Sequence, residues 1–224
     1  MSTAESQSQP AYLNSLDQII KDVIAPLAPG IDQTGAFPHE AIKALGQAGL
    51  LGLISSVEVG GMGQSHRAAT TVVERIASAC ASTAMVVCMH YAAAAVIEVH
   101  GPRSVREDIA RGDHLTTLAF SESGSRSHFW APIGTAKRVD GGVRLDAKKS
   151  WVTSAGQATS YVWSSRPLEA EGQSTIWLVP ADAENLSIPQ PFNGLGLRGN
   201  HSSPVVADGV LLPADAILGA DGGG

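Results

Sequence analysis

Residues 135–147 read TAKRVDGGVRLDA, two short strand-like runs on either side of Asp140-Gly141-Gly142. An Asp-Gly pair between such runs is a strong hairpin signal, because its residues accept the positive backbone φ angles of a tight turn. In the second run Val143 and Leu145 alternate with charged residues, which indicates a strand with one buried face and one solvent face. This stretch therefore predicts antiparallel β-sheet.

Further strand-like runs surround the hairpin, and all of them follow Gly112-Asp113. They cover residues 116–120, 151–154, 160–165, 174–179 and 204–212. Several short strands separated by frequent turns are typical of an antiparallel barrel or sandwich. We therefore expect a β domain over residues 114–224.

Before residue 113 the apolar pattern is that of helices. Apolar residues recur every three or four positions over 12–27, and Pro26 with Pro29 is expected to end that helix. Pro38 is suited to the first turn of a second helix. Residues 67–99 and 104–110 are also expected to be helical.

The predicted fold class is therefore α+β with two domains. An all-helical N-terminal domain covers 12–113, an antiparallel β-barrel or sandwich covers 114–224, and residues 1–11 form a disordered N-terminus.

Composition excludes several classes of protein. The 224 residues are 44% hydrophobic and carry 15 Lys and Arg against 21 Asp and Glu, a net charge of −6. Binding along a nucleic-acid backbone needs a surplus of basic residues, and no part of the chain has one. The cysteines, Cys80 and Cys88, are too few for a disulfide framework or a four-cysteine metal site. Residues 1–10 do not resemble a signal peptide, so we expect a cytoplasmic protein.

Residues 76–97 contain no charged side chain and are long enough to span a bilayer. They are mostly Ala with polar residues interspersed, and Ala favours membrane insertion far less than Leu or Ile does. We expect a buried helix, or two helices that break near Ser82-Thr83, and no membrane span.

Two other sequence patterns give little support for a binding site. Residues 194–199 match the G-x-G-x-x-G dinucleotide fingerprint, but prolines precede the match and a strand-like run follows it, so a loop is expected. The seven histidines include no pair at metal-ligand spacing on a shared helix face, so no metal site is predicted.

Residues 118–153 carry the strongest functional signal. Gly and small hydroxyl residues over 121–127 would bring backbone N–H groups close to a phosphate or to the polar edge of a flavin ring. Trp151 and Thr153 are two residues apart, which places both on one face of a strand. An aromatic ligand site is one interpretation, and a core tryptophan in a barrel is the other.

Short matches along the whole chain have the order and spacing of one family. They are Phe37-Pro38-His39-Glu40, 48–53 (AGLLGL), Gly60-Gly61-Met62-Gly63, Glu74-Arg75-Ile76-Ala77, Ser82-Thr83-Ala84, Ser121-Glu122, Gly124, Ser127, Trp151-Val152-Thr153, Gly196-Leu197-Arg198-Gly199, 210–213 (VLLP) and Leu218-Gly219. The chain resembles the acyl-CoA dehydrogenase family over about residues 12–224. The resemblance implies a helical domain, a middle β domain, and FAD bound against the middle domain.

The resemblance also implies roles for single residues. Phe120 and Ser121 fall where the family uses backbone and hydroxyl groups on the flavin ring. Trp151 falls on the residue that packs against the ring, and Thr153 on the one that hydrogen-bonds near its reactive nitrogen. Ser127 falls on the serine near the FAD pyrophosphate and the CoA portion of the substrate.

The loop departs from the family at three positions. Ser123 replaces the usual Pro, Arg126 the usual Gly, and His128 the usual Asp. Arg126 is large and cationic, so it is expected either to bind a phosphate of FAD or of the substrate, or to block the usual acyl-CoA path.

The function implied by the resemblance is α,β-dehydrogenation of an acyl-CoA thioester, with hydride transfer to FAD. Expected partners are an electron-transfer flavoprotein or another electron acceptor, and a homodimer or homotetramer is expected for the complete protein. The family's C-terminal helical bundle, which carries the catalytic Glu, has no counterpart here. The chain is therefore expected to be a fragment, inactive on its own, with no catalytic residue among these 224.

Two alternatives remain at this point. One is a flavin-dependent monooxygenase on the same scaffold, with His90, Tyr91 or His128 serving an oxygen-reactive pocket. The other is a non-catalytic fragment that binds flavin or a partner protein.

Overall fold

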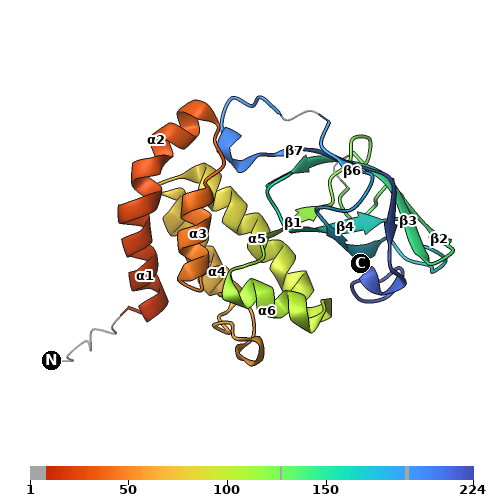
Figure 1. Ribbon diagram of the computed structural model, residues 1–224, viewed down its shortest axis with the longest axis horizontal. Helices are drawn as coiled ribbons and strands as arrows, with labels where there is room; N and C mark the ends of the chain where they lie inside the picture. Colours follow the sequence, from red (N-terminus) through yellow and green to blue (C-terminus); the bar gives the residue numbers. More distant parts are fainter. Residues whose placement is uncertain (1–8, 127, 190–191) are drawn as a thin grey trace.

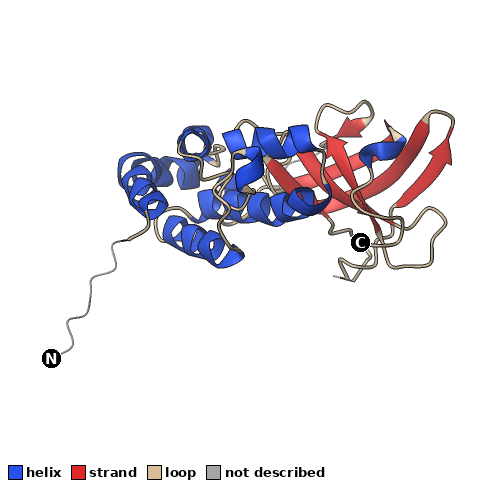
Figure 2. Cartoon of the chain, turned by 90° about the horizontal axis from the view of Figure 1, so that it is seen from below, coloured by secondary structure: helices blue, strands red, loops and turns tan. Residues whose placement is uncertain are grey.

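The structure is a computed structural model that describes residues 9–126, 128–189 and 192–224. Helices form the first half of the chain and strands the second, and the change falls between Arg111 and Thr116 (Figures 1 and 2). The predicted disordered segment, residues 1–11, lies outside the described residues except for 9–11, and Ala11 already begins the first helix.

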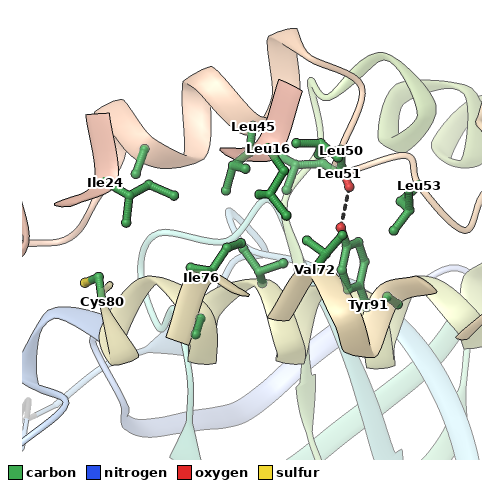
Figure 3. Close-up of a cluster of buried hydrophobic side chains, with 14 of the residues drawn as sticks. Leu16, Ile24, Leu45, Leu50, Leu51, Leu53, Val72, Ile76, Cys80 and Tyr91 are labelled. Atoms are coloured by element: carbon green, nitrogen blue, oxygen red, sulfur yellow. Dashed lines mark hydrogen bonds between the residues drawn. The ribbon is translucent and has the colours of Figure 1, made fainter. Parts of the chain in front are cut away.

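The helices of the described chain pack around the long helix α5. They are α1 (Ala11–Ile19), α2 (Ala25–Thr34), α3 (His39–Gln47), α4 (His66–Ala77), α5 (Ala81–His100) and α6 (Arg103–Arg111). The apolar stripes of α1 to α5 meet in one core, in which Leu16, Leu45 and Ile76 are fully buried (Figure 3). Ile109 of α6 packs in a second cluster that includes Ala93 of α5. Burial of a Leu or Ile side chain stabilises a fold by about 1.5–3 kcal/mol, so this core supplies much of the stability of the helical domain.

The first helix continues through the prolines that were expected to end it. A π-helical turn, Ile20–Ile24, joins α1 to α2, and Pro26 falls in the first turn of α2. Proline has no N–H to donate, and its ring crowds the carbonyl four residues earlier. The wider π turn just before Pro26 gives the ring room, so the helix continues. Pro29 lies inside α2, and the helix ends only at Gly35, whose φ is +72°. The prediction of a stop at Pro26 and Pro29 is wrong.

The uncharged stretch forms parts of two helices, with the break at residues 78–80, slightly earlier than expected. By length and composition α5 could cross a membrane, but 56% of its apolar window is buried inside the protein. It packs against α4 on one side and against β1 on the other. Its apolar character is that of a core helix.

The strands of the described residues form two sheets. They are β1 (Thr116–Ala119), β2 (Thr135–Val139), β3 (Gly142–Val152), β4 (Ser160–Ser165), β5 (Thr175–Pro180), β6 (Leu186–Ser187) and β7 (Ser203–Leu212). One sheet has the order β1-β4-β5 and the other β2-β3-β7-β6. The two share a core that contains the fully buried Trp163 and Trp177. The predicted hairpin is confirmed, since β2 pairs with β3 around Gly141.

One pairing departs from the expected antiparallel arrangement, because β1 and β4 run parallel. The chain between them crosses to the other sheet as β2 and β3 and then returns, and such a long connection permits parallel pairing. The fingerprint at 194–199 lies in a loop that ends in a 3-10 turn, Arg198–Asn200, and leads into β7. The prediction of a loop at these residues is therefore confirmed.

Buried polar side chains of α5 bond to the segment after α3 and to the start of the β domain. The hydroxyl of Tyr91 donates to the carbonyl of Leu50 at 2.6 Å (Figure 3). His90 Nε2 lies 3.0 Å from the carbonyl of Leu51, and the Thr116 amide at the start of β1 donates to Nδ1 at 3.2 Å. This pattern fits a neutral ring that carries its proton on Nε2. Burial lowers the pKa of His90 from 6.5 to about 4.

The depressed pKa of His90 predicts acid destabilisation. Below pH 6.5 the unfolded chain binds a proton that the folded chain binds only near pH 4. The free energy of unfolding should therefore fall by about 3 kcal/mol between pH 6.5 and 4, with no further loss from this group at lower pH. Urea denaturation across this range would measure the slope. His90→Gln should flatten it, whereas His66→Gln, at an exposed position, should not. The same slope in His90→Gln as in the unchanged chain would contradict the assignment.

Candidate functional site

A cavity of about 480 Å³ opens between the loop that follows β1 and the end of β3. Three aromatic side chains line it, Phe129, Trp151 and Phe192. The rest of the lining is mainly polar: Ser121, Glu122, Ser123, Ser125, Lys148, Ser150 and Pro204. Flat apolar walls beside hydroxyl groups suit a planar ligand with one polar edge.

Backbone pairing holds the loop to the end of β3. The Ser150 amide donates to the Ser121 carbonyl at 2.8 Å, and Glu122 forms an isolated antiparallel bridge with Lys149. Ser121 is exposed at the cavity, whereas Phe120 is partly buried and packs against the apolar cluster between α5 and β4. The structure thus brings Phe120 and Ser121, predicted from the sequence, next to the strand that carries Trp151.

Trp151 lies on a β-bulge. Lys149 pairs with Val205 of β7 and Val152 with Ser203, so two residues of β3 oppose one of β7. A bulge turns a side chain away from its regular direction, and Trp151 is 66% exposed. Its ring packs on Phe192 with centroids 4.1 Å apart. The alternative that Trp151 is a core tryptophan is therefore wrong.

Thr153 lies one residue beyond the end of β3, so it does not share a regular strand face with Trp151 as the two-residue spacing predicted. It is buried, and its hydroxyl oxygen is 3.3 Å from that of Ser202. Ser202 and Trp151 line a second, smaller cavity of about 170 Å³. Thr153 thus lies behind the site, and its hydroxyl contacts a residue that lines this second cavity.

The remaining predicted residues lie on the same loop. Arg126 is exposed, and its φ of +54° is in the left-handed region. That backbone conformation favours glycine, which the family usually has at this position. Ser127 lies outside the described residues. His128 stacks on Trp130 with ring centroids 5.0 Å apart.

Reasoning from the sequence missed a buried ion pair beneath the cavity. Lys149 Nζ lies 2.8 Å from Glu122 Oε1, and the two side chains are 0% and 3% exposed. Burial lowers the pKa of Lys149 to about 8, and the nearby Glu122 carboxylate opposes that shift. The inward direction of Lys149 could have been predicted from the sequence, because Lys149 continues at period two the inward-facing series Val143, Leu145 and Ala147.

Two domain families match the sequence in agreement with this architecture. Residues 6–112 match "Acyl-CoA dehydrogenase, N-terminal domain", and residues 117–210 match "Acyl-CoA dehydrogenase, middle domain". The chain belongs to the acyl-CoA dehydrogenase family. The family matches cover both the helical and the β part of the chain, including the strands around the cavity.

Individual relatives within the acyl-CoA dehydrogenase family are similar over most of this chain. It is 30% identical over 211 residues to the probable acyl-CoA dehydrogenase YngJ of Bacillus subtilis, covering 89% of this chain and 54% of the relative. It is 28% identical over 207 residues to the human mitochondrial short-chain specific acyl-CoA dehydrogenase, covering 89% and 50%. The chain thus spans about half the length of these curated relatives.

Solved structures have the same fold. Butyryl-CoA dehydrogenase from Megasphaera elsdenii superimposes with a TM-score of 0.87 at 19% identity, covering 100% of this chain and 61% of that one. A structure described as the FAD complex of PigA superimposes with a TM-score of 0.85 at 18% identity and the same coverage.

The structure excludes two of the residues that the monooxygenase alternative would use. His90 is fully buried with both ring nitrogens hydrogen-bonded to backbone groups, and the Tyr91 hydroxyl is bonded to a backbone carbonyl. Their polar atoms serve the fold, so neither is available to an oxygen-reactive pocket. His128 is exposed on the loop.

The buried pair predicts a large effect of one substitution on stability. Lys149→Met leaves the Glu122 carboxylate buried without its counter-charge, so the free energy of unfolding should fall by about 3–5 kcal/mol. Lys148→Met, at the exposed neighbouring position of the same strand, should change it by less than about 0.5 kcal/mol. Urea denaturation of both variants would measure the difference. Similar losses in the two would show that the ion pair contributes nothing specific.

Proposed function

We propose that this chain binds FAD in the cavity beside Trp151 and forms the flavin site of an oxidoreductase that dehydrogenates an acyl-CoA thioester between its α- and β-carbons. The observation that carries the proposal is the exposure of Trp151, which a β-bulge turns out of the sheet toward a serine-rich loop. Family membership supports the reaction class, since the relatives are named as acyl-CoA dehydrogenases.

The residues present fit FAD. An isoalloxazine ring is planar, with apolar faces and one edge of nitrogen and oxygen atoms. The indole of Trp151 and the ring of Phe192 offer apolar planes, while Ser121 and Ser150 place hydroxyl groups at the same cavity. Aromatic side chains provide large contact areas in defined orientations, so these walls can set the plane of a bound ring.

FAD, when bound, supplies the two-electron acceptor of the reaction. The part of this chain is to hold and orient: Trp151 offers a ring face, and the exposed Ser121 offers a hydroxyl to a polar edge. Glu122 is the carboxylate at the cavity, but Lys149 and the backbone amides of 133 and 134 already occupy it. A proton acceptor for the α-proton must therefore be a carboxylate other than Glu122.

The proposal also covers the electron acceptor, the oligomeric state and the cellular location. We propose that electrons pass from the flavin to an electron-transfer flavoprotein or another acceptor, and that the complete protein is a homodimer or homotetramer. Cytoplasmic location is part of the same proposal. It is supported by the free thiols of Cys80 and Cys88, which are stable in a reducing compartment.

Trp151→Ala tests the flavin site directly. Loss of the ring face should raise the dissociation constant for FAD about tenfold, since an aromatic pair contributes about 0.5–1.5 kcal/mol beyond the area that it buries. Quenching of FAD fluorescence on titration with protein would measure it. The matched control is Trp130→Ala, an exposed tryptophan of the loop that follows β1, which does not line the cavity and should leave the constant unchanged. Unchanged FAD affinity in a folded Trp151→Ala protein would refute the assignment.

Arg126→Ala tests the predicted phosphate contact. A guanidinium on this loop can bind phosphate oxygens of FAD or of an acyl-CoA in a bidentate manner. At low ionic strength the variant should bind one of these ligands about fivefold more weakly, and the difference should shrink as salt screens the charge. Arg138→Ala, an exposed arginine on β2, is the control. If both ligands bind as before at every salt concentration, Arg126 is a surface charge.

A further inference from the structure

The Lys149–Glu122 pair connects four segments of the β domain. Besides Glu122, Lys149 Nζ donates to the carbonyl of Ser164 at 2.7 Å and to that of Phe120 at 3.3 Å. It also lies 3.0 Å from Ser164 Oγ. The ammonium group, carried on β3, is thus bonded to the residue after β1, to the loop and to β4. All its hydrogens have acceptors inside the protein.

The Glu122 carboxylate holds the far end of the loop, at residues 133 and 134. The Gly134 amide lies 3.1 Å from both oxygens of Glu122, and the Ile133 amide donates to Oε2. A side chain at 134 would obstruct this contact, since a Cβ there would be 2.7 Å from Glu122 Oε1. Glu122 therefore joins the start of the loop to the residues just before β2. The loop that carries Ser123, Ser125 and Arg126 is closed at its base by one charged group.

The base of the loop lies directly beneath the cavity. Ser121 precedes Glu122, and Trp151 follows Lys149 by two residues. Lys149 is fully buried, and Glu122 borders the cavity but is itself buried, while Ser121 and Trp151 line the site beside them. Charge-assisted hydrogen bonds are short and directional, so this pair restrains distance and orientation more tightly than an apolar contact of equal area.

We propose that Lys149 and Glu122 are positioning residues of the FAD site, whose ion pair holds the Ser121 loop at a fixed spacing from Trp151. The inference rests on the proposed FAD site. Lys149 is fully buried, and the Glu122 oxygens are already bonded to Lys149 and to the amides of 133 and 134, so neither charged group is free to bond to the ligand. The pair acts through the backbone of residues 120–122 and 149–151, which presents the hydroxyl edge and the ring face of the site.

The test removes both charges together, because a single uncompensated charge would disturb folding. Glu122→Gln with Lys149→Met keeps the side-chain volumes similar. Folding is checked by circular dichroism, the FAD dissociation constant by fluorescence quenching, and the environment of the bound ring by its visible absorption spectrum. We expect the constant to rise about tenfold and the fine structure of the flavin band to be lost.

The matched control neutralises a different ion pair, which is partly buried and remote from the cavity. Arg106 and Glu98 in the helical domain are 2.7 Å apart, with side chains 17% and 18% exposed. Glu98→Gln with Arg106→Met should lower stability but leave FAD affinity and the flavin spectrum unchanged. A change confined to the Lys149–Glu122 variant supports the positioning role, because a general loss of stability would affect both variants.

Other outcomes overturn the inference. A folded Glu122→Gln/Lys149→Met protein with unchanged FAD affinity and spectrum refutes the positioning role while the FAD site stands. If that protein does not fold, Glu122→Gln alone retains an oxygen acceptor for the amides of 133 and 134. It should bind FAD about threefold more weakly with an altered spectrum, and unchanged binding there also refutes the role. If the unchanged chain does not bind FAD, the proposed FAD site fails, and the positioning role fails with it.

Discussion

The ammonium group of Lys149 lies inside the β domain, and the geometry of the candidate site depends on how its charge is satisfied. An isolated buried charge is strongly unfavourable, so the Glu122 carboxylate and the carbonyls of Phe120 and Ser164 must all converge on Nζ. Their convergence brings the end of β1, the serine-rich loop and β3 to one place. The exposed ring of Trp151 acquires its polar neighbours from this arrangement.

A second set of polar contacts joins the helical domain to this region. Arg198 donates to the carbonyls of Asp32 and Gln33 at the end of α2, and His201 Nε2 lies 3.2 Å from the carbonyl of Gly35. On the other side, the neutral His90 of α5 bonds to the amide that begins β1. The strands that enter and leave the site are thus held from two helices, α2 and α5 (Figure 1). A ligand site built on strands held in this way is more rigid than one on loops alone.

The candidate site shows how much can be predicted from local sequence patterns. The composition of the loop and the aromatic residue at 151 indicated a flavin-type ligand, and Lys149 continued the inward series of its strand. The outward turn of Trp151 could not be predicted, because a bulge depends on how β3 registers with β7, more than 50 residues away along the chain. The partner of Lys149 could not be predicted either, because Glu122 and Lys149 lie on two segments that are not adjacent in sequence.

The sequence by itself determined the local elements of this protein: the hairpin around Gly141, the strand at 160–165, the helix that begins after Pro38, and the change from helices to strands near residue 113. These depend on side-chain periodicity and turn chemistry, which act over a few residues. Tertiary structure alone decided the passage of the first helix through Pro26, the parallel pairing of β1 with β4, and the buried ion pair. Each depends on which distant segments meet, and the free energy of that meeting is shared among contacts that no local window of sequence contains.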